Sequence, residues 1–312
     1  MANDIFAEKH FHDEDEAYKF VEARIWPNGP VCPHCGETSR ISKMKGKSTR
    51  RGVYKCYGCR SPFSVKVGTV FEASHLPLRV WLQGFALLCA SKKGISSNQL
   101  HRTLGISIKA AWFMSHRLRE AMKPSAAAMF GSGGKIVESD ETFLGRLKGQ
   151  PKRRAFHHKM KVLTLIERDS GQARSVVIDN VKHKTLAPIL RKHIAKEAKL
   201  MTDEAGGYRV VGQYFAKHGV VRHGREEYVH PDDPTIHTNT AEGYFSIFKR
   251  GMKGIYQHCS ERHLHRYIAE FDFRYNHRAR LKISDTERAE IALRGIVGKR
   301  LTYKETPARP AA

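Results

Sequence analysis

Near its C-terminal end the chain contains the stretch His237-Thr-Asn239-Thr-Ala-Glu242-Gly-Tyr-Phe-Ser-Ile-Phe-Lys249. Read as a helix, this stretch has an apolar face whose residues recur at helical spacing: Ala241, Tyr244, Phe245, Phe248 and Met252. Asn239, Glu242 and Lys249 line up on a second face, where the Glu242 carboxylate and the Lys249 ammonium lie about two turns apart and point the same way. We therefore expect this helix to pack on a core with one face and to present the other to a functional site.

Two aspartates upstream belong to the same prediction. Asp140 and Asp203 each end an apolar run that reads as a strand. Divalent metals that assist phosphoryl transfer need hard oxygen ligands that converge at one point. The sequence thus predicts a metal-binding set of Asp140, Asp203 and Glu242, with Lys249 as a cation beside it.

A further acid is expected on the first of these strands. Glu138 shares a strand face with Asp140 because side chains alternate with a period of two, whereas Glu141 is expected to point away. Glu138 is therefore the preferred additional acid.

Each candidate also has a plainer interpretation. Asp140 and Asp203 are residues of a type that commonly begins loops. Asn239-Thr-Ala-Glu242 matches a capping box, in which Asn239 is the N-cap and Glu242 reaches back to it. Lys249 taken alone fits a solvated helix residue. The four residues together favour the functional interpretation.

The charge balance indicates a polyanionic partner. Among 312 residues, 55 are Lys or Arg and 31 are Asp or Glu, which leaves a net charge of +24. No apolar stretch is long enough to span a bilayer, and the charged N-terminus lacks the apolar core of a signal peptide. We expect a cytoplasmic, nucleoid-associated protein that binds nucleic acid and no membrane.

Two C-x-x-C pairs predict a structural zinc site, and their members are Cys32, Cys35, Cys56 and Cys59. Each pair forms a tight turn that aims two thiolates at one point, and Gly36 and Gly58 suit such turns because glycine tolerates positive φ. The alternatives are four ordinary buried cysteines or a redox pair. Cys89 and Cys259 are left over as core or incidental residues.

A helix-turn-helix is predicted after the cysteines. Gly105 permits a turn between two helical runs, and Ser107 caps the second run, which continues to Met122. Several polar side chains then remain for DNA phosphates or base edges: Ser107, Lys109, His116, Arg117 and Arg119. An ordinary helical hairpin is the alternative.

The second half of the chain predicts a mixed α/β sheet of the ribonuclease-H kind. A small-residue linker at 124–134 precedes it. The expected strands are 135–143, 161–167, 173–178, 199–202 and 226–230, and the expected helical segments are 186–198, 208–217, 239–250 and 260–277.

Basic residues flank the predicted acids. The loop between the first two strands contains Lys152, Arg153 and Arg154, and Arg250 follows Lys249 on the late helix. We expect these side chains to hold DNA phosphates, although the loop also fits a solvated, mobile segment.

The chain resembles bacterial insertion-sequence transposases of the ISXO type, which join a zinc ribbon and a helix-turn-helix to a DDE catalytic domain with a ribonuclease-H-like fold. The resemblance covers roughly residues 15–280. Its matching segments include Cys32-Pro-His-Cys35-Gly, Cys56-Tyr-Gly-Cys59, Glu138-Ser-Asp140-Glu-Thr-Phe-Leu-Gly145, Thr202-Asp203-Glu-Ala-Gly-Gly-Tyr208, His237-Thr-Asn239-Thr-Ala-Glu242-Gly and Glu270-Phe-Asp-Phe-Arg-Tyr-Asn276.

The resemblance implies roles for the candidate residues. Asp140 and Asp203 would be the first two acids of the triad, and Lys249 its associated lysine. The third position is Asn in many members and Glu or another residue in others, and here Asn239 and Glu242 both qualify. We favour Glu242 because a carboxylate binds Mg²⁺ better than a neutral amide does.

The activity implied is cutting and joining of double-stranded DNA. Two Mg²⁺ (or Mn²⁺) ions would serve cleavage at the terminal inverted repeats, and the freed 3′-hydroxyl would attack target DNA. A homodimer or higher oligomer is expected on DNA. The alternatives are a structure-specific nuclease without strand transfer and a non-catalytic DNA-binding regulator.

The expected domains follow from the same resemblance. They are an N-terminal helix at 1–27, a zinc ribbon at 28–70, a helix-turn-helix region at 76–123, the catalytic domain at 132–282, and a C-terminal helix and tail at 283–312.

Overall fold

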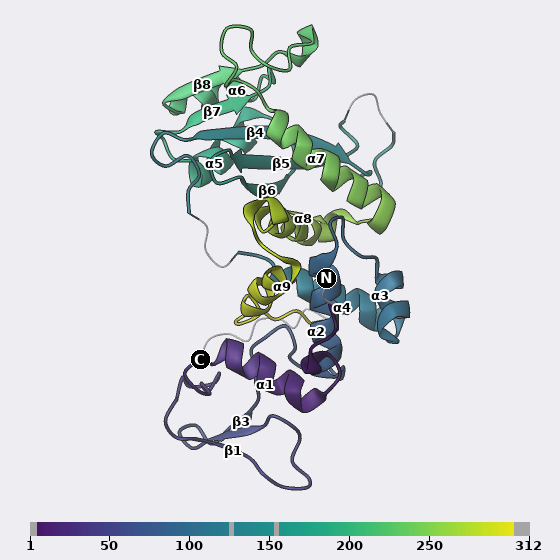
Figure 1. Ribbon diagram of the computed structural model, residues 1–312. Helices are drawn as coiled ribbons and strands as arrows, with labels where there is room; N and C mark the ends of the chain where they lie inside the picture. The colour runs from purple at the N-terminus through teal and green to yellow at the C-terminus, as the bar shows by residue number, and fades with distance from the viewer. Residues whose placement is uncertain (1–4, 125–127, 153–155, 303–312) are drawn as a thin grey trace. The chain divides into compact units, whose positions relative to one another are not determined.

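The computed structural model describes residues 5–124, 128–152 and 156–302. These residues form two compact units, the first from 1–123 together with 282–312 and the second from 124–281 (Figure 1). Residues 125–127 of the predicted linker lie outside the described residues. Each unit is described by itself below.

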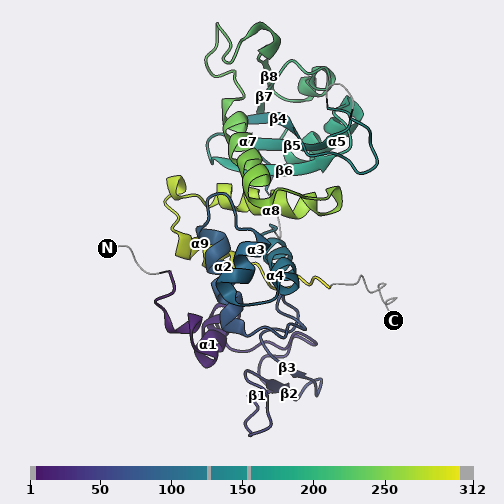
Figure 2. The same cartoon turned by 90° about the vertical axis from the view of Figure 1, so that its right-hand side faces the viewer.

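The first unit begins with a helix and a small sheet. Helix α1 (Glu14–Ile25) starts at Asp13, whose side chain accepts a hydrogen bond from the Glu16 backbone N–H at 2.9 Å. Strands β1 (Ile41–Lys43), β2 (Tyr54–Cys56) and β3 (Pro62–Phe63) follow as an antiparallel sheet in that order (Figure 2). The strands are very short, so the cysteine cluster described below supplies much of the local order.

The rest of the first unit is helical. It comprises α2 (Leu78–Ala90), α3 (Ser97–Leu104), α4 (Ile108–Ala121) and α9 (Asp285–Arg294). Gly105 adopts φ 63° between α3 and α4, a left-handed conformation that glycine reaches without strain. Ser96 and Ser107 accept hydrogen bonds from the backbone N–H groups of Gln99 and Ala110. Two helices around a tight turn thus lie where the sequence places them.

The second unit is built on one sheet of five strands in the order β6-β5-β4-β7-β8. The strands are β4 (Ile136–Leu144), β5 (Met160–Glu167), β6 (Gln172–Ile178), β7 (Lys199–Thr202) and β8 (Lys217–Val220). β4, β5 and β6 pair antiparallel, whereas β7 and β8 pair parallel to β4 and to each other. This is the mixed sheet of the ribonuclease-H-like class, as the sequence predicts.

Helices cover both faces of this sheet (Figure 1). On one face lie α5 (His183–His193) and α6 (Tyr208–Val211), and on the other α7 (Asn239–Gly251) and α8 (Glu261–Asn276). β5 is buried along its whole length, with Leu163 and Leu165 facing the first pair and Val162 and Ile166 the second. The predicted apolar stripe of α7 is buried, and each of its large side chains contributes about 1.5–3 kcal/mol to stability.

The fifth strand lies earlier than predicted. It is β8 (Lys217–Val220), whereas residues 226–230 form only an isolated bridge from Val229 to His237. The composition of β8 hides it, because its sequence Lys-His-Gly-Val has little apolar alternation. A Cβ on Gly219 would lie 2.6 Å from the Met201 sulfur. β8 can therefore pack this closely only because residue 219 has no side chain.

The helical segment predicted at 208–217 is also shorter than expected. α6 gives way to a 3-10 turn, Gly212–Tyr214. A Cβ on Gly212 would lie 2.0 Å from the His218 ring, so the chain turns here to bring β8 against the sheet.

Candidate active site and zinc cluster

Asp140 and Asp203 lie side by side because of strand register. β4 and β7 run parallel with Val137 opposite Leu200 and Glu138 opposite Met201. Two residues further along each chain, this register brings Asp140 next to Asp203 at the carboxyl end of β7. Together with Glu141, their carboxylates offer oxygens that all lie within 4.8 Å of one another.

Burial makes this acid cluster (Asp140, Glu141 and Asp203) costly to ionise. Burial, followed by the charge of Asp203, raises the pKa of Asp140 to about 7. Burial likewise raises the pKa of Glu141 to about 8 and lifts the pKa of Asp203 above its ordinary value. A group of half-buried carboxylates that repel one another fits a divalent cation with hard oxygen ligands, such as Mg²⁺.

Hydrogen bonds fix the orientation of the three carboxylates. Asp140 accepts from the backbone N–H of Glu141 at 2.7 Å, and Asp203 accepts from that of Ala205 at 3.0 Å. The hydroxyl of Tyr208 donates to Glu141 at 2.7 Å. Tyr208 is buried, so it holds the Glu141 carboxylate against the cluster.

The predicted roles of Glu138 and Glu141 were therefore interchanged. Glu141 belongs to the acid cluster, whereas Glu138 is fully buried and holds α7. The period of two is correct, but the β4–β7 pairing ends at Glu138 and Met201, so side chains from either face of β4 reach around the end of β7. Asp140 does not end its strand as predicted, because β4 continues to Leu144. Two adjacent acids inside a strand, Asp140 and Glu141, are the signal that the period argument passed over.

Glu138 is the anchor of α7. Its carboxylate accepts from the Thr240 hydroxyl at 2.8 Å and from the Ala241 backbone N–H at 2.9 Å. Arg168 donates to the same carboxylate at 2.5 Å and also to the carbonyls of Thr235 and His237. An anion at a helix N-terminus is stabilised by the helix dipole, and here that anion comes from the sheet.

The capping box, the plainer interpretation of Asn239 and Glu242, does not form in α7. The N-cap residue is Thr238, its side chain makes no capping hydrogen bond, and Asn239 is the first helical residue. Glu138 instead accepts from one N–H of the first turn, that of Ala241. The Glu242 side chain is left to solvent and to His223, whose Nε2 lies 3.7 Å from the Glu242 carboxylate. The Glu242 side chain is 45% exposed.

The polar face of α7 lies toward the acid cluster without joining it. The charges of Glu242 and Lys249 both act on the pKa of Asp140, Glu242 raising it and Lys249 lowering it. Among the described residues, the carboxylates within 4.8 Å of one another are those of Asp140, Glu141 and Asp203, and Glu242 is not part of that group. Asn239 and Lys249 are exposed.

The other predicted cluster is the set of cysteines, whose sulfur atoms all lie within 4.8 Å of one another: Cys32, Cys35, Cys56 and Cys59. Sγ atoms of Cys32 and Cys59 are 3.7 Å apart, and those of Cys35 and Cys56 are 3.6 Å apart. A tetrahedral zinc site with Zn–S bonds of about 2.3 Å has sulfur–sulfur edges of about 3.8 Å. The cysteine cluster therefore fits structural zinc.

The glycines of the two turns act differently from each other. Gly36 adopts φ 76°, as predicted, and its N–H donates to the Cys32 carbonyl at 2.9 Å. Gly58 has no positive φ; in the second turn Arg60 does, at 61°. A Cβ on Gly58 would lie 3.3 Å from the Glu37 carboxylate and 3.5 Å from the Cys56 sulfur, so a side chain there would need only a small shift of Glu37.

The assignment of Arg117 and Arg119 to DNA was wrong. Arg117 is 5% exposed and donates to the carbonyls of Val70, Glu72 and Leu301, and Arg119 is 1% exposed and donates to the Ser115 hydroxyl. His116, also offered for DNA, is buried as well. α4 contacts α2, α3 and α9, so most of its surface lies inside the unit.

The remaining residues proposed for DNA lie at the surface. Ser107, Lys109, Lys152, Lys249 and Arg250 are exposed, and Arg153 and Arg154 lie outside the described residues. The Ser107 side chain also caps α4.

The cysteine cluster and the mixed sheet with its acid cluster define the class of protein. Residues 12–61 match the transposase zinc-ribbon domain, and residues 132–276 match the ISXO2-like transposase domain. The chain belongs to the ISXO-type family of insertion-sequence transposases, as its resemblance predicts.

One relative comes from a transposable element. An uncharacterized protein in transposable element ISH50 of Halobacterium salinarum is 26% identical over 283 residues, which cover 85% of this chain and 92% of that protein. A chain of the simian T-cell lymphotropic virus intasome, solved with PP2A regulatory subunit B56 gamma, is 14% identical with a TM-score of 0.29. That match covers 56% of this chain and 63% of the other, and a similarity this weak says nothing about function.

Within the described ranges, every helix is too short or too polar to cross a bilayer.

Proposed function

We propose that this transposase cleaves the DNA ends of its insertion element and joins them to a target. The observation that carries the proposal is the acid cluster, in which Asp140 and Asp203 leave neighbouring parallel strands and converge with Glu141. Cutting followed by joining at one site needs no covalent enzyme intermediate, so it calls for metal ligands rather than a nucleophilic side chain.

The acid cluster would hold two Mg²⁺ or Mn²⁺ ions through Asp140, Asp203 and a third ligand. Bound there, the metal supplies Lewis-acid chemistry to the reacting phosphodiester. Burial and the charges of the neighbouring carboxylates raise the pKa of Asp140 and of Glu141, because both disfavour the ionised forms. A bound cation would favour the ionised forms and so offset this effect. Tyr208 keeps the Glu141 carboxylate in place by its hydrogen bond.

We propose Glu242 as the third triad residue. Its charge raises the pKa of Asp140, which supports proximity to the acid cluster, and a carboxylate suits Mg²⁺ better than the amide of Asn239. Its exposure leaves it able to turn toward a bound cation. Lys249, two turns further along α7, would hold a DNA phosphate or offset charge that develops on it.

The first unit would choose the DNA. We propose that the zinc ribbon and the helices α3 and α4 bind the terminal inverted repeat, with Lys109 among the contacts, and that Lys152 and Arg250 hold phosphates near the acid cluster. A dimer or larger assembly would bring two element ends together.

A strand-transfer assay tests this proposal. The DNA flanking the gene is incubated with Mg²⁺ and wild-type protein, Asp140→Ala, Asn239→Ala or Glu242→Ala. We expect joined products from wild type and a loss of at least about a thousandfold for Asp140→Ala, because the metal no longer has its ligands. Glu242→Ala should lose far more activity than Asn239→Ala.

The products separate the rival functions. Cleaved DNA without joined products would indicate a nuclease. DNA binding with neither product would indicate a regulator. Cleavage by Asp140→Ala equal to wild type would overturn the assignment of the site.

A further inference from the structure

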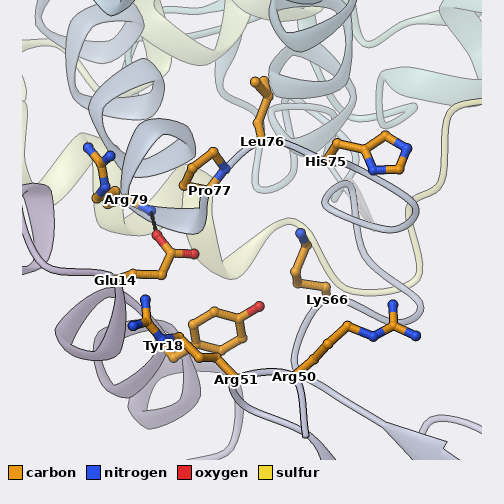
Figure 3. A pocket seen from close by; sticks show the side chains of 9 residues that line it. All are labelled: Glu14, Tyr18, Arg50, Arg51, Lys66, His75, Leu76, Pro77 and Arg79. Carbon is orange, nitrogen blue, oxygen red and sulfur yellow. Dashed lines mark hydrogen bonds between the residues drawn. The ribbon is translucent and has the colours of Figure 1, made fainter. Parts of the chain in front are cut away.

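A basic cavity lies within the first unit, where four segments meet (Figure 3). They are the start of α1, the loop between β1 and β2, the segment after β3 and the start of α2. The cavity has a volume of 380 Å³ and is open to solvent. Its charged lining residues are Glu14, Arg50, Arg51, Lys66, His75 and Arg79.

The one acid of this lining is already engaged. Glu14 accepts hydrogen bonds from the backbone N–H groups of Leu78 at 2.7 Å and Arg79 at 3.1 Å, which begin α2. The N-cap residue of α2 is Pro77, whose side chain cannot accept a hydrogen bond. Glu14, which lies on α1, caps α2 in its place. The helix N-terminus is thereby satisfied, and the basic side chains are left facing the cavity.

Lys66 is the deepest of these cations. Its ammonium donates to the Ser74 carbonyl at 2.8 Å, and burial lowers its pKa. An ammonium has three N–H donors, and in the described part of the chain Lys66 forms no ion pair. In Figure 3 its ammonium points into the cavity, as does the hydroxyl of Tyr18. A half-buried cation with spare donors is a natural anion ligand.

Arg50 and Arg79 add two further cations. Within residues 5–124, 128–152 and 156–302, neither guanidinium forms an ion pair. Arg51 has only an exposed contact with Asp15, at 3.2 Å. Contacts of that kind contribute little, so a ligand can displace them. The cavity thus gathers positive charge that the protein itself does not neutralise.

We propose that this cavity binds a backbone phosphate of the DNA, with Lys66 and Arg50 as its main ligands. The inference rests on the proposed DNA-binding function of the first unit and adds a site to it. Guanidinium and ammonium groups are the usual partners of phosphate oxygens. The open mouth suits a phosphate that remains part of a strand, and its place beside the zinc ribbon would fix the register of that domain on the duplex.

Fluorescence anisotropy over a range of salt concentrations tests the site. The full-length zinc-loaded protein is titrated into labelled element-end DNA without added Mg²⁺. Lys66→Gln and Arg50→Gln each replace a cation by a neutral donor. The matched control is Lys47→Gln, an exposed lysine on the same loop as Arg50 and outside the cavity.

Loss of one phosphate contact should make the slope of log K against log salt shallower by about 0.9, which corresponds to about eightfold weaker binding at 0.1 M salt. A scrambled duplex should lose the same factor, because a phosphate carries no sequence information. Lys47→Gln should bind as wild type does.

Several results would overturn the inference. Slopes equal to the control for both variants would do so, and so would a loss confined to the element-end sequence. If Lys66→Gln fails to fold, as judged by zinc content and melting, the exposed Arg50→Gln decides alone.

Binding of inorganic phosphate by wild type with unaltered DNA affinity in the variants would indicate a site for the free anion instead. No DNA binding by wild type would refute the DNA-binding function itself, whereas cleavage by Asp140→Ala would refute the catalytic site and leave the cavity standing.

Discussion

The cysteine cluster and the acid cluster are both sets of ligand atoms within 4.8 Å of one another, yet they differ in every property that decides what a metal does there. The sulfur pairs of the cysteine cluster, at 3.6 and 3.7 Å, already match the edges of a tetrahedron, and four ligands close it. The acid cluster has three carboxylates, and the further candidate, Glu242, stands apart on α7.

This difference is the one expected between a site for a structural metal and the proposed site for a catalytic one. A closed tetrahedron has no place for a substrate, so its metal contributes to folding. Three carboxylates do not fill the coordination of a divalent cation, so a metal held there would have room for a phosphodiester. The sequence also places the two clusters in different ways. Spacing along the chain brings the cysteines together, whereas strand register brings Asp140 and Asp203 together.

The largest expected effect comes from opening the cysteine cluster. Cys56→Ser should lose zinc, and the first unit should then fail to fold, because a structural zinc site contributes about 10–16 kcal/mol at neutral pH. Metal analysis and thermal melting measure this. Cys259→Ser, which removes a thiol outside the cluster, should keep full zinc content. Equal zinc content and equal melting temperatures in the two variants would contradict a structural zinc site at the cysteine cluster.

The second largest effect is expected from Glu138, the acid on β4 that lies outside the acid cluster. Glu138→Ala leaves Arg168, whose side chain is only 15% exposed, without its partner and removes the N-terminal anchor of α7. Breaking a buried pair in this way costs about 3–5 kcal/mol. Denaturant unfolding should therefore show a large loss for Glu138→Ala and a smaller one for Glu138→Gln, which keeps an oxygen acceptor. A Glu138→Ala protein as stable as wild type would show that α7 is held by packing alone.

The smallest effect concerns pH. The pKa values of Asp140 and Glu141, about 7 and 8 in the fold, lie above their ordinary values of 3.8 and 4.5, so the folded state binds these protons more tightly than the unfolded state. Stability of the metal-free acid cluster is thus greatest below about pH 4 and is lost as the pH rises toward 8. Between pH 5 and pH 8 this contribution should lower the melting temperature by several degrees.

Two controls sharpen the pH prediction. Mg²⁺ should restore much of the lost stability at pH 8, because it neutralises the ionised carboxylates. Glu141→Gln should show a weaker dependence on pH than wild type. A melting temperature that responds to neither pH nor Mg²⁺ would argue against a metal site at the acid cluster.

Much of this architecture can be predicted from the sequence, because it depends on local patterns. Alternation and apolar runs locate β4 to β7, helical spacing gives α7 and its buried face, and C-x-x-C spacing gives the cysteine cluster. Asp140 and Asp203 are recognisable as acids that follow apolar runs, and strand register brings them together.

The remaining features depend on partners that are distant along the chain. Glu138 caps α7 from more than a hundred residues away, so the local capping-box motif misleads. Arg117 and Arg119 look available for DNA in the sequence, but both are buried, and Arg117 donates to carbonyls that are distant along the chain. β8 relies on Gly219 and its neighbours rather than on apolar alternation. In each case tertiary packing overrides the local pattern.

Ligation of the metal by Asp203 can be measured most directly with Asp203→Cys in the cleavage assay on element-end DNA. Mg²⁺ demands oxygen ligands, whereas Mn²⁺ accepts a sulfur ligand more readily. We expect Asp203→Cys not to cleave the DNA with Mg²⁺ and to regain cleavage with Mn²⁺. The wild-type protein should cleave the DNA with either ion. Cleavage by Asp203→Cys at the wild-type rate in Mg²⁺, or no recovery in Mn²⁺ by a protein that melts as wild type does, would contradict ligation of the metal by Asp203.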